Sequence, residues 1–451
     1  MKTIYFPRYQ RAFCATGDGV GSHPLFRHLA HPPDGYRFVS TPVGWPQWLA
    51  QLPVQCRNLW RRWRDLRVLG RPLGLSSLDT CKFVRTRGLS RIVPAPKGTV
   101  ASFLPTYPLT HLNENWFLET EDTTTVFDPY ALNGRTRDVR FRELKAFPLI
   151  RQLLESPRCL GILTHVRSTQ AGVITLFQSD TIANKTVFIP PAYVPILPVL
   201  EGDLDSWRVS QPVRFFFHIS WNQDPNGFFL RGGVSVLECF ERLLARNYPV
   251  TLALRSALPP AIQNRFAPLL AHPGVEVLDR FMTAEEYVLL LRSSHYFLLP
   301  SARLHVVSLM EAMYYGAVPI VSDGWGIQEY VENQATGHVV SGVYSVVSWI
   351  DAETGTLHED YDPMYRMPGI LTEALTRCVT RLLDETSDRA SVALRAHRQV
   401  RDQHNIDLFN RGFSRFLDRG LVSREASRHQ EARGRSLHDQ PVDNARELGR
   451  P

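Results

Sequence analysis

Hydrophobic and polar positions follow one another along this chain in short blocks that predict strands and helices in turn. Short apolar runs that suit buried strands occupy residues 3–6, 213–220 and 295–300. Between them lie segments whose apolar residues recur every three or four positions, which is the spacing of a helix with one buried face. This alternation predicts an α/β fold with parallel sheets that are covered by helices on both faces.

Residues 299–340 carry the most informative pattern. They predict a buried strand that ends at Pro300, a short loop and a helix over about 308–315. A second buried strand, AVPIVS, follows, and then a turn punctuated by glycines and another short helix. The order strand, loop, helix is that of a doubly wound α/β sheet.

Ligands of such sheets bind outside the carboxyl ends of the strands, at helix N-termini. The free backbone N–H groups of Ser308, Leu309 and Met310 are therefore expected to face an anion, with Glu311 one step further into the helix. A diphosphate with a sugar on either side suits this arrangement.

The stretch from Leu309 to Val340 resembles the donor-nucleotide motif of GT-B glycosyltransferases of the family 4 type, written E-x7-E and followed by EAM-x-x-G-x-P-[IV]-[IV]. The resemblance implies two Rossmann-like domains that face a cleft, with the carboxylate of Glu311 on the ribose hydroxyls of a nucleotide sugar. The family's first Glu is replaced by Arg303, and Leu-His-Val follows where Gly-Phe-Gly is usual. We therefore expect the contacts to the donor sugar to differ from those of the family's common hexoses.

The same resemblance points to phosphate-binding residues earlier in the second half of the chain. The family has an Arg and a Lys five residues apart just before a Gly, and here that spacing gives Asn226 and Arg231. An Arg can hold a diphosphate through a bidentate fork, whereas Asn226 brings no charge. Arg303 is a further candidate cation for the diphosphate.

A glycine-rich loop follows the first predicted strand and contains Gly17, Gly19 and Gly21. Glycines let the backbone approach a ligand closely, as loops near phosphates do. A plain turn from strand to helix would show the same residues. The resemblance favours the ligand interpretation, since the family has such a loop across the cleft from the donor diphosphate.

Candidate catalytic residues lie in the segment 109–127, whose mixed polarity predicts a strand end and a loop. His111, Glu121 and Asp122 are placed there to reach a cleft. A His or a carboxylate at this position would orient the acceptor hydroxyl or take its proton. A purely structural role for each of them stays open.

Residues 45–71 predict a helix with one apolar stripe, whose other faces carry Trp60 and several arginines. One interpretation is a helix that lies on an anionic membrane surface. The other is a surface helix that covers the sheet and whose arginines are solvated. A nucleic-acid partner is not expected, because no other segment combines clustered basic residues with aromatic ones.

Length and composition predict two domains, since 451 residues exceed what one core normally organises. The predicted parts are an N-terminal domain over 1–190, a linker over 191–210, a C-terminal donor domain over 211–385, helices returning to the first domain over 386–419, and a disordered tail over 420–451. The tail is expected because it has few large apolar residues and many charges.

Charge and cysteine content add little to this picture. The net charge of +7 suits phosphorylated ligands, anionic lipid or nucleic acid alike. The six cysteines show neither CxxC pairs nor metal-ligand spacing. No apolar stretch has the length of a membrane span, and the N-terminus lacks the apolar run of a signal peptide, so a cytoplasmic location is expected.

The expected activity is transfer of a sugar from a UDP-, GDP- or ADP-sugar to a glycan or lipid-linked acceptor, in polysaccharide or glycolipid assembly. The resemblance implies retention of the anomeric configuration. No metal-binding DxD-type motif is evident at a strand end, so a reaction without a metal or other cofactor is expected. The alternative is a degenerate GT-B module that binds a nucleotide sugar or a glycan without turnover.

Overall fold

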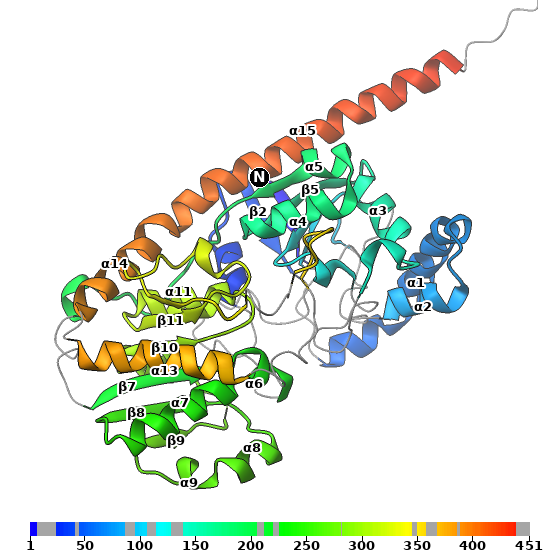
Figure 1. Ribbon diagram of the computed structural model, residues 1–451. Coiled ribbons are helices and arrows are strands. Elements are labelled where there is room, and N and C mark those ends of the chain that lie inside the picture. Colours follow the sequence, from blue (N-terminus) through cyan, green and yellow to red (C-terminus); the bar gives the residue numbers. More distant parts are fainter. Residues whose placement is uncertain are drawn as a thin grey trace, which may run out of the picture.

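The computed structural model contains two α/β domains, each built on a six-stranded sheet (Figure 1). The structure describes residues 1–6, 24–40, 45–85, 95–105, 114–127, 139–204, 212–219, 225–280, 282–344, 350–357, 368–385 and 388–438. The glycines predicted to contact a ligand (Gly17, Gly19 and Gly21) and His111 lie outside these ranges.

The first domain has a wholly parallel sheet in the order β2-β1-β3-β4-β5-β6. Its strands are β1 (Lys2–Tyr5), β2 (Tyr36–Val39), β3 (Thr99–Pro105), β4 (Trp116–Thr120), β5 (Cys159–Thr164) and β6 (Thr186–Phe188). Its helices are η1 (Pro24–Ala30), α1 (Trp45–Gly70), η2 (Arg71–Leu73), α2 (Ser77–Arg85), η4 (Thr124–Phe127), η5 (Phe141–Glu143), α3 (Phe147–Glu155), α4 (Arg167–Phe177) and α5 (Asp180–Lys185).

The second domain has a wholly parallel sheet in the order β12-β11-β10-β7-β8-β9. Its strands are β7 (Val213–His218), β8 (Val250–Arg255), β9 (Val275–Val277), β10 (Tyr296–Leu299), β11 (Val318–Ser322) and β12 (His338–Val340). Its helices are α6 (Pro225–Leu230), α7 (Gly233–Ala245), α8 (Pro260–Arg265), α9 (Ala267–Leu270), α10 (Ala284–Arg292), α11 (Val306–Tyr314), η7 (Ile327–Glu329) and α13 (Pro368–Asp384). A short 3-10 turn, η6 (Glu201–Leu204), lies in the predicted linker between the domains.

The central strands are apolar on both faces, as expected for sheets covered by helices on both sides. Phe215, Phe216 and Phe217 follow one another in β7, and none of the three is exposed to solvent. The predicted α/β fold with two doubly wound parallel sheets is therefore confirmed. In each sheet the strand order reverses once, between β1 and β3 in the first and between β7 and β10 in the second. Crevices for ligands form at such points.

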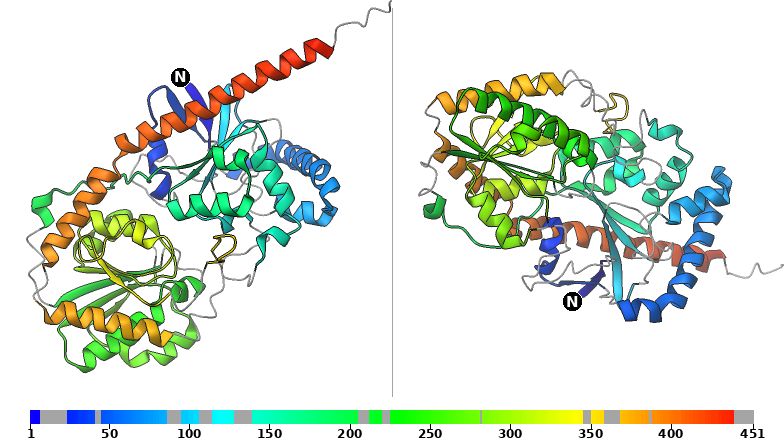
Figure 2. Two further views of the ribbon diagram at one scale, coloured as in Figure 1. Left: turned by 45° about the horizontal axis from the view of Figure 1, so that its top comes forward. Right: turned by 90° about the horizontal axis from the view of Figure 1, so that it is seen from below.

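Two helices after α13 connect the domains again. α14 (Arg389–Gln403) packs on α11 of the second domain, and α15 (Ile406–His438) crosses to the first domain and packs on β5. Figures 1 and 2 show α15 as one long helix that runs along the first domain and projects beyond it. The returning helices thus tie the two sheets together from outside.

The helical end of the chain differs from the disordered tail expected from residue 420. α15 continues to His438, and residues 439–451 lie outside the described part. Packing explains the first part of the extension. A Cβ at Gly420 would lie only 2.8 Å from the carbonyl oxygen of Leu160, and Arg424 is buried. The scarcity of large apolar residues was therefore misleading at the start of this segment, because a small residue, Gly420, allows the helix to approach β4 and β5 closely.

The predicted helix over 45–71 is confirmed as α1. Its Leu66 is buried and Trp63 packs against the same core, whereas Trp60 is 56 % exposed beside Arg64. No helix among the described residues is long and apolar enough to cross a membrane.

Replacement of Phe413 by Ala is expected to lower the free energy of unfolding by about 3–5 kcal/mol, because it empties a tightly packed aromatic site. Phe413 in α15 is fully buried, and its ring centroid lies 4.9 Å from Phe409, 5.5 Å from Phe103 and 5.8 Å from Phe38. Urea unfolding monitored by circular dichroism measures the loss.

Val422→Ala is the matched control, since Val422 lies on the same helix and is 61 % exposed. It is expected to change the free energy of unfolding by no more than about 0.5 kcal/mol. Equal effects of the two substitutions would contradict the docking of α15 on the first domain.

Candidate functional site

The carboxyl edges of the two sheets face each other. Arg303, which follows β10, lies 3.2 Å from Asp122, which follows β4. Glu329, in the turn after β11, contacts Ser168 at the start of α4. These contacts bring the carboxyl ends of β4 and β5 against those of β10 and β11, and the ligand crevice of such a fold lies at the carboxyl ends of its strands.

Glu311 lies at this interface on α11 and is only 6 % exposed. It pairs with Arg27 of the first domain, whose Nη1 lies 3.7 Å from the Glu311 Oε1. Burial raises the pKa of the Glu311 carboxyl from 4.5 to about 7, and the charges of Arg27 and Arg255 and a hydrogen bond with Tyr287 oppose the rise. The sequence-predicted carboxylate is thus deep in the interface and only partly compensated.

The prediction of free amides at Ser308, Leu309 and Met310 was wrong in its register. α11 begins at Val306, two residues earlier than expected, and the Leu309 amide donates to the His305 carbonyl at 3.1 Å. Ser308 lies in the first turn, where amides have no intrahelical acceptor. The helix starts early because the apolar Val306 and Val307 are buried and continue its core-facing surface.

Two arginines converge on the carboxyl end of β7. Arg231, which is 3 % exposed, donates from Nη1 to the His218 carbonyl at 3.2 Å. Arg255, the last residue of β8, donates from Nη1 to the Ile219 carbonyl at 3.3 Å. Burial, together with the charges of Arg303 and Arg255, lowers the pKa of Arg231 to about 9. The sequence predicted Arg231 at this site and did not identify Arg255.

Asn226, the partner expected for Arg231, lies in α6 and not in the loop before it. Its side chain lies outside the described part of the chain, so its contact with phosphate stays a prediction.

Arg303 stands where the resemblance has a Glu, and its partner comes from the first domain. The Arg303 Nη1 lies 3.2 Å from the Asp122 Oδ2, and both side chains are largely buried. The other oxygen of Asp122 accepts from the amides of Thr124 and Thr125 at 2.8 and 3.1 Å. Asp122 therefore fixes a turn and an ion pair between domains, and its oxygens are already engaged.

Among the predicted catalytic residues that the structure describes, Glu121 has the carboxylate that is suited to proton transfer. Its backbone carbonyl accepts from Thr169 at 2.7 Å, which fixes the residue at the start of the loop. Burial raises the pKa of the Glu121 carboxyl to about 7, against the opposing charge of Arg303. A pKa near the working pH is what a general base requires.

The sequence did not reveal a buried histidine that lies on the same side of the interface as Glu121, in the first domain. His165 directly follows β5, and its Nε2 lies 3.0 Å from the Glu119 Oε1, while Nδ1 contacts the Ile189 carbonyl at 2.9 Å. Burial would lower the pKa of His165, but the hydrogen bond and charge of Glu119 raise it above its usual value. Its position directly after a buried strand was the signal that could have found it.

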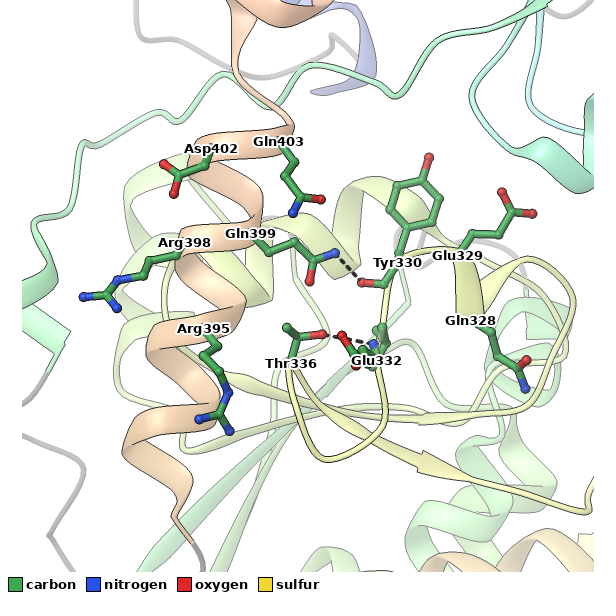
Figure 3. A pocket seen from close by; sticks show the side chains of 11 residues that line it. Gln328, Glu329, Tyr330, Glu332, Thr336, Arg395, Arg398, Gln399, Asp402 and Gln403 are labelled. Carbon is green, nitrogen blue, oxygen red and sulfur yellow. Dashed lines mark hydrogen bonds between the residues drawn. The ribbon is translucent and has the colours of Figure 1, made fainter.

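A second set of contacts joins the domains beside His165. The carboxylate of Glu329 accepts from the backbone amides of Arg167 and Ser168 at 2.6 and 2.9 Å, and Tyr330 donates its hydroxyl to the His165 carbonyl. Figure 3 shows Glu329 and Tyr330 pointing to the same side, above the groove between this turn and α14. Glu329 lies in the 3-10 helix η7 and caps α4 of the other domain.

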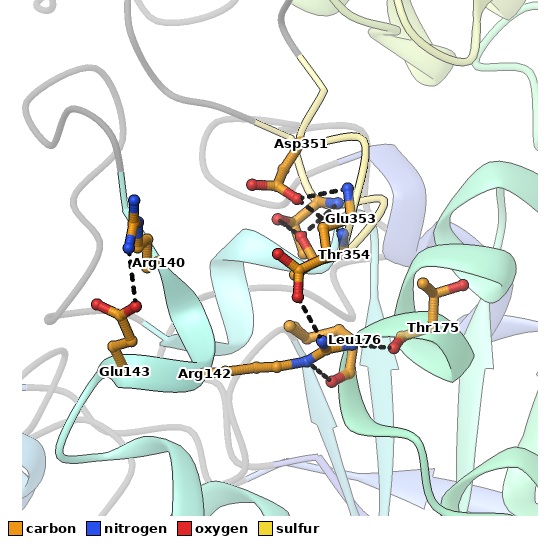
Figure 4. Close-up of polar contacts among 9 residues, drawn as sticks. Arg140, Arg142, Glu143, Thr175, Leu176, Asp351, Glu353 and Thr354 are labelled. Atoms are coloured by element: carbon orange, nitrogen blue, oxygen red, sulfur yellow. Dashed lines mark hydrogen bonds and ion pairs between the residues drawn. The ribbon is translucent and has the colours of Figure 1, made fainter.

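The segment 350–357 makes a further contact between the domains (Figure 4). Arg142 forms an ion pair with Glu353 at 3.0 Å and donates to the carbonyls of Leu176 and Thr175 at 3.1 and 2.8 Å. Asp351 accepts from the amides of Glu353 and Thr354, which shapes the segment. These contacts flank the end of α4 opposite to the end that Glu329 caps.

Within the described ranges, no three His, Cys, Asp or Glu side chains gather in a way that would hold a metal ion. The independence of metal expected from the sequence stays a prediction.

Comparison with known proteins identifies the fold. No protein-family model and no curated protein matches the chain. The solved structure of Anabaena HepE in complex with UDP is 13 % identical, covers 93 % of this chain and 100 % of its own, and gives a TM-score of 0.51. The N-terminal domain of trehalose-6-phosphate phosphatase from Candida albicans is 12 % identical, covers 93 % of this chain and 97 % of its own, and gives 0.55. The predicted GT-B fold is confirmed, and the family 4 assignment stays a prediction.

Replacement of Glu329 by Gln is expected to lower the free energy of unfolding by about 0.5–2 kcal/mol, because the cap of α4 loses its charge next to the helix N-terminus. Glu332→Gln is the control, since Glu332 is an exposed residue of the same turn region. Urea unfolding of both variants measures the difference. An unchanged stability of Glu329→Gln would show that the contact between the domains contributes nothing.

Stability is expected to depend on pH through Glu311. Its pKa is raised in the folded state, so the folded chain holds the proton more tightly than the unfolded chain between about pH 4.5 and 7. The free energy of unfolding should therefore fall as the pH rises through this window. Glu311→Gln has no proton to lose, so relative to the wild type it should gain up to about 3 kcal/mol between pH 5 and pH 8.

Urea unfolding of both proteins at pH 5 and pH 8 measures this gain. Glu121 titrates in both proteins, so its contribution cancels in the comparison. A stability difference that is the same at both pH values would contradict the burial of Glu311.

Proposed function

We propose that this chain transfers a sugar from a nucleotide-sugar donor to a glycan or lipid-linked acceptor in polysaccharide or glycolipid assembly. The observation that carries the proposal is the buried carboxylate of Glu311 on α11, close to the strand-order reversal of the second sheet and facing the first domain. A carboxylate accepts hydrogen bonds from two neighbouring hydroxyls, which is the chemistry of a ribose. Donor binding would displace Arg27 from Glu311.

Positive charge around Glu311 supports a donor with a diphosphate. Arg231 and Arg303 lie within electrostatic range of each other at the same sheet edge. In glycosyl transfer, negative charge grows on the departing diphosphate while the sugar becomes oxocarbenium-like, so fixed cations stabilise the transition state. Arginines that are already in place would provide this stabilisation without a metal ion.

The proposed reaction retains the anomeric configuration. The proposal assigns no carboxylate among the described residues as a nucleophile that attacks the sugar. The acceptor hydroxyl would attack on the face that the diphosphate leaves, and the diphosphate would take its proton. Glu121, with its pKa of about 7, would orient the acceptor hydroxyl from the wall of the first domain.

HepE, whose structure contains UDP, shares the fold over nearly the whole chain, and this supports UDP as the first donor base to test. GDP- and ADP-sugars remain in the proposal, since the described residues do not distinguish the bases.

The acceptor side is proposed to meet an anionic membrane surface through α1. Trp60 is exposed there, and Arg57, Arg61 and Arg64 are exposed on the same helix. Aromatic and basic side chains together suit the boundary between headgroups and acyl chains. The protein would then act on the inner face of the cell membrane, where lipid-linked acceptors are built.

A second candidate function is binding of a nucleotide sugar or glycan without turnover. The observation that favours it is the ion pair of Arg303 with Asp122, which occupies a position where the resemblance places a sugar-binding Glu. Only the first function predicts cleavage of the donor.

One of UDP, GDP and ADP is expected to raise the melting temperature of the wild type without added metal. Glu311→Ala should weaken binding of that nucleotide about 10- to 100-fold, because it removes hydrogen bonds to a charged acceptor. Thermal shift followed by calorimetric titration measures both effects. Glu285→Ala, at an exposed position of α10, is the control and should bind like the wild type.

Hydrolysis or transfer of the matching nucleotide sugar then separates the two functions. Release of the nucleoside diphosphate by the wild type supports the enzyme, and binding without release supports the second candidate. If no nucleotide is bound, or if Glu311→Ala binds as tightly as the wild type, the proposal is wrong.

A further inference from the structure

Arg255 lies at the carboxyl edge of the second sheet. It ends β8 and pairs in register with His218, the last residue of β7. β7 borders the point where the strand order reverses, so the side chain of Arg255 lies within one strand of the predicted ligand crevice. The strand VTLAL, apolar except for Thr251, thus ends in a cation.

The contacts of Arg255 among the described residues are with a backbone carbonyl and an aromatic ring. Nη1 donates to the Ile219 carbonyl at 3.3 Å, and the guanidinium carbon lies 5.8 Å from the centroid of the Tyr287 ring. The Nε is buried and has no hydrogen-bond partner. Among the described residues, no carboxylate lies within ion-pair distance of Arg255, in contrast to Arg27 with Glu311 and Arg303 with Asp122.

Arg255 and Arg231 approach the same short stretch of backbone from different elements. Arg231 donates to the carbonyl of His218 and Arg255 donates to that of the next residue, Ile219. The charge of Arg255 lowers the pKa of Arg231 and that of Glu311. The two guanidinium groups therefore lie in one neighbourhood, next to the carboxylate that the proposed function places on the ribose.

Arg231 is buried and Arg255 is partly buried, so these like charges repel each other with little water between them to screen the repulsion. An anion with several oxygens and more than one negative charge would relieve this repulsion and would satisfy the buried Nε of Arg255. A diphosphate fits because each of its phosphate groups can accept from one guanidinium.

We propose that Arg255 is a diphosphate-binding residue and that Arg231 and Arg255 together clamp the diphosphate of the donor. The inference rests on the proposed function. It assigns a diphosphate contact to β8, whereas the side chains predicted from the sequence to bind phosphate lie in or near α6 and α11. Asn226 brings no charge to this site, and Arg255 provides the second cation.

The experiment compares ligands that contain a diphosphate with ligands that lack it. UDP, GDP and ADP, their nucleosides and inorganic pyrophosphate are titrated calorimetrically into the wild type, Arg255→Met, Arg255→Lys and Arg246→Met. Met keeps an unbranched apolar stem against Tyr287. Arg246→Met is the matched control, because Arg246 is an exposed arginine that follows the C-terminus of α7, whereas Arg231 precedes its N-terminus. Circular dichroism and the melting temperature without ligand verify the fold of each variant.

Arg255→Met is expected to bind the preferred nucleoside diphosphate about 10- to 100-fold more weakly, with the affinity for the nucleoside unchanged. Pyrophosphate should lose affinity in parallel. Arg255→Lys should lie between the wild type and Met, since it keeps the charge and loses the fork. Arg246→Met should bind every ligand like the wild type.

Failure of this inference is distinguishable from failure of the proposed function. If the wild type binds a nucleoside diphosphate and both Arg255 variants bind it equally well, the role of Arg255 is refuted while the proposed function stands. Equal losses for the nucleoside and the diphosphate would also refute it, since they would indicate a structural role. If the wild type binds none of the ligands, both proposals are wrong.

Discussion

A buried carboxylate between two domains sets the main constraint on this molecule. Burial favours the protonated form of Glu311, whereas the charges of Arg27 and Arg255 favour the ionised form. Arg27 comes from the first domain and Arg255 from the second, so the electrostatics of Glu311 depend on how the domains are placed. A ligand that supplies hydroxyls to Glu311 and negative charge to the arginines would satisfy groups that the protein itself leaves only partly compensated.

The contacts around this interface hold the two carboxyl edges at a fixed distance. Glu329 caps α4, Arg303 pairs with Asp122, and α15 packs along the first domain after leaving the second. Each contact joins residues far apart in the sequence, and the two side-chain contacts lie near strand ends.

The sequence predicted what depends on local pattern. Alternating apolar runs predicted both sheets, whereas Glu311 and Arg231 were identified through the resemblance to the glycosyltransferase motifs. The start of α11 was displaced by two residues, because the buried Val306 extends the helix beyond the pattern that was recognised. Arg303 and Asp122 were each identified, but their pairing could not be predicted, since the two lie 181 residues apart and meet only when the domains pack.

Three features escaped sequence reasoning for a common physical reason. His165 and Arg255 look like ordinary residues at the ends of apolar strands, and their importance comes from what neighbouring strands bring beside them. Glu329 has the pattern of a residue that caps its own helix, and only tertiary structure shows that it caps α4 of the other domain. Local periodicity places such side chains at an edge of a sheet, and it carries no information about the opposite domain.

A crystal structure of the chain with the nucleoside diphosphate for which it has the highest affinity would test the central claim most directly. The account predicts the ribose hydroxyls on the carboxylate of Glu311, with Arg27 displaced from it and the diphosphate against Arg231. A nucleotide bound elsewhere, with the contact between Arg27 and Glu311 still at 3.7 Å, would contradict it.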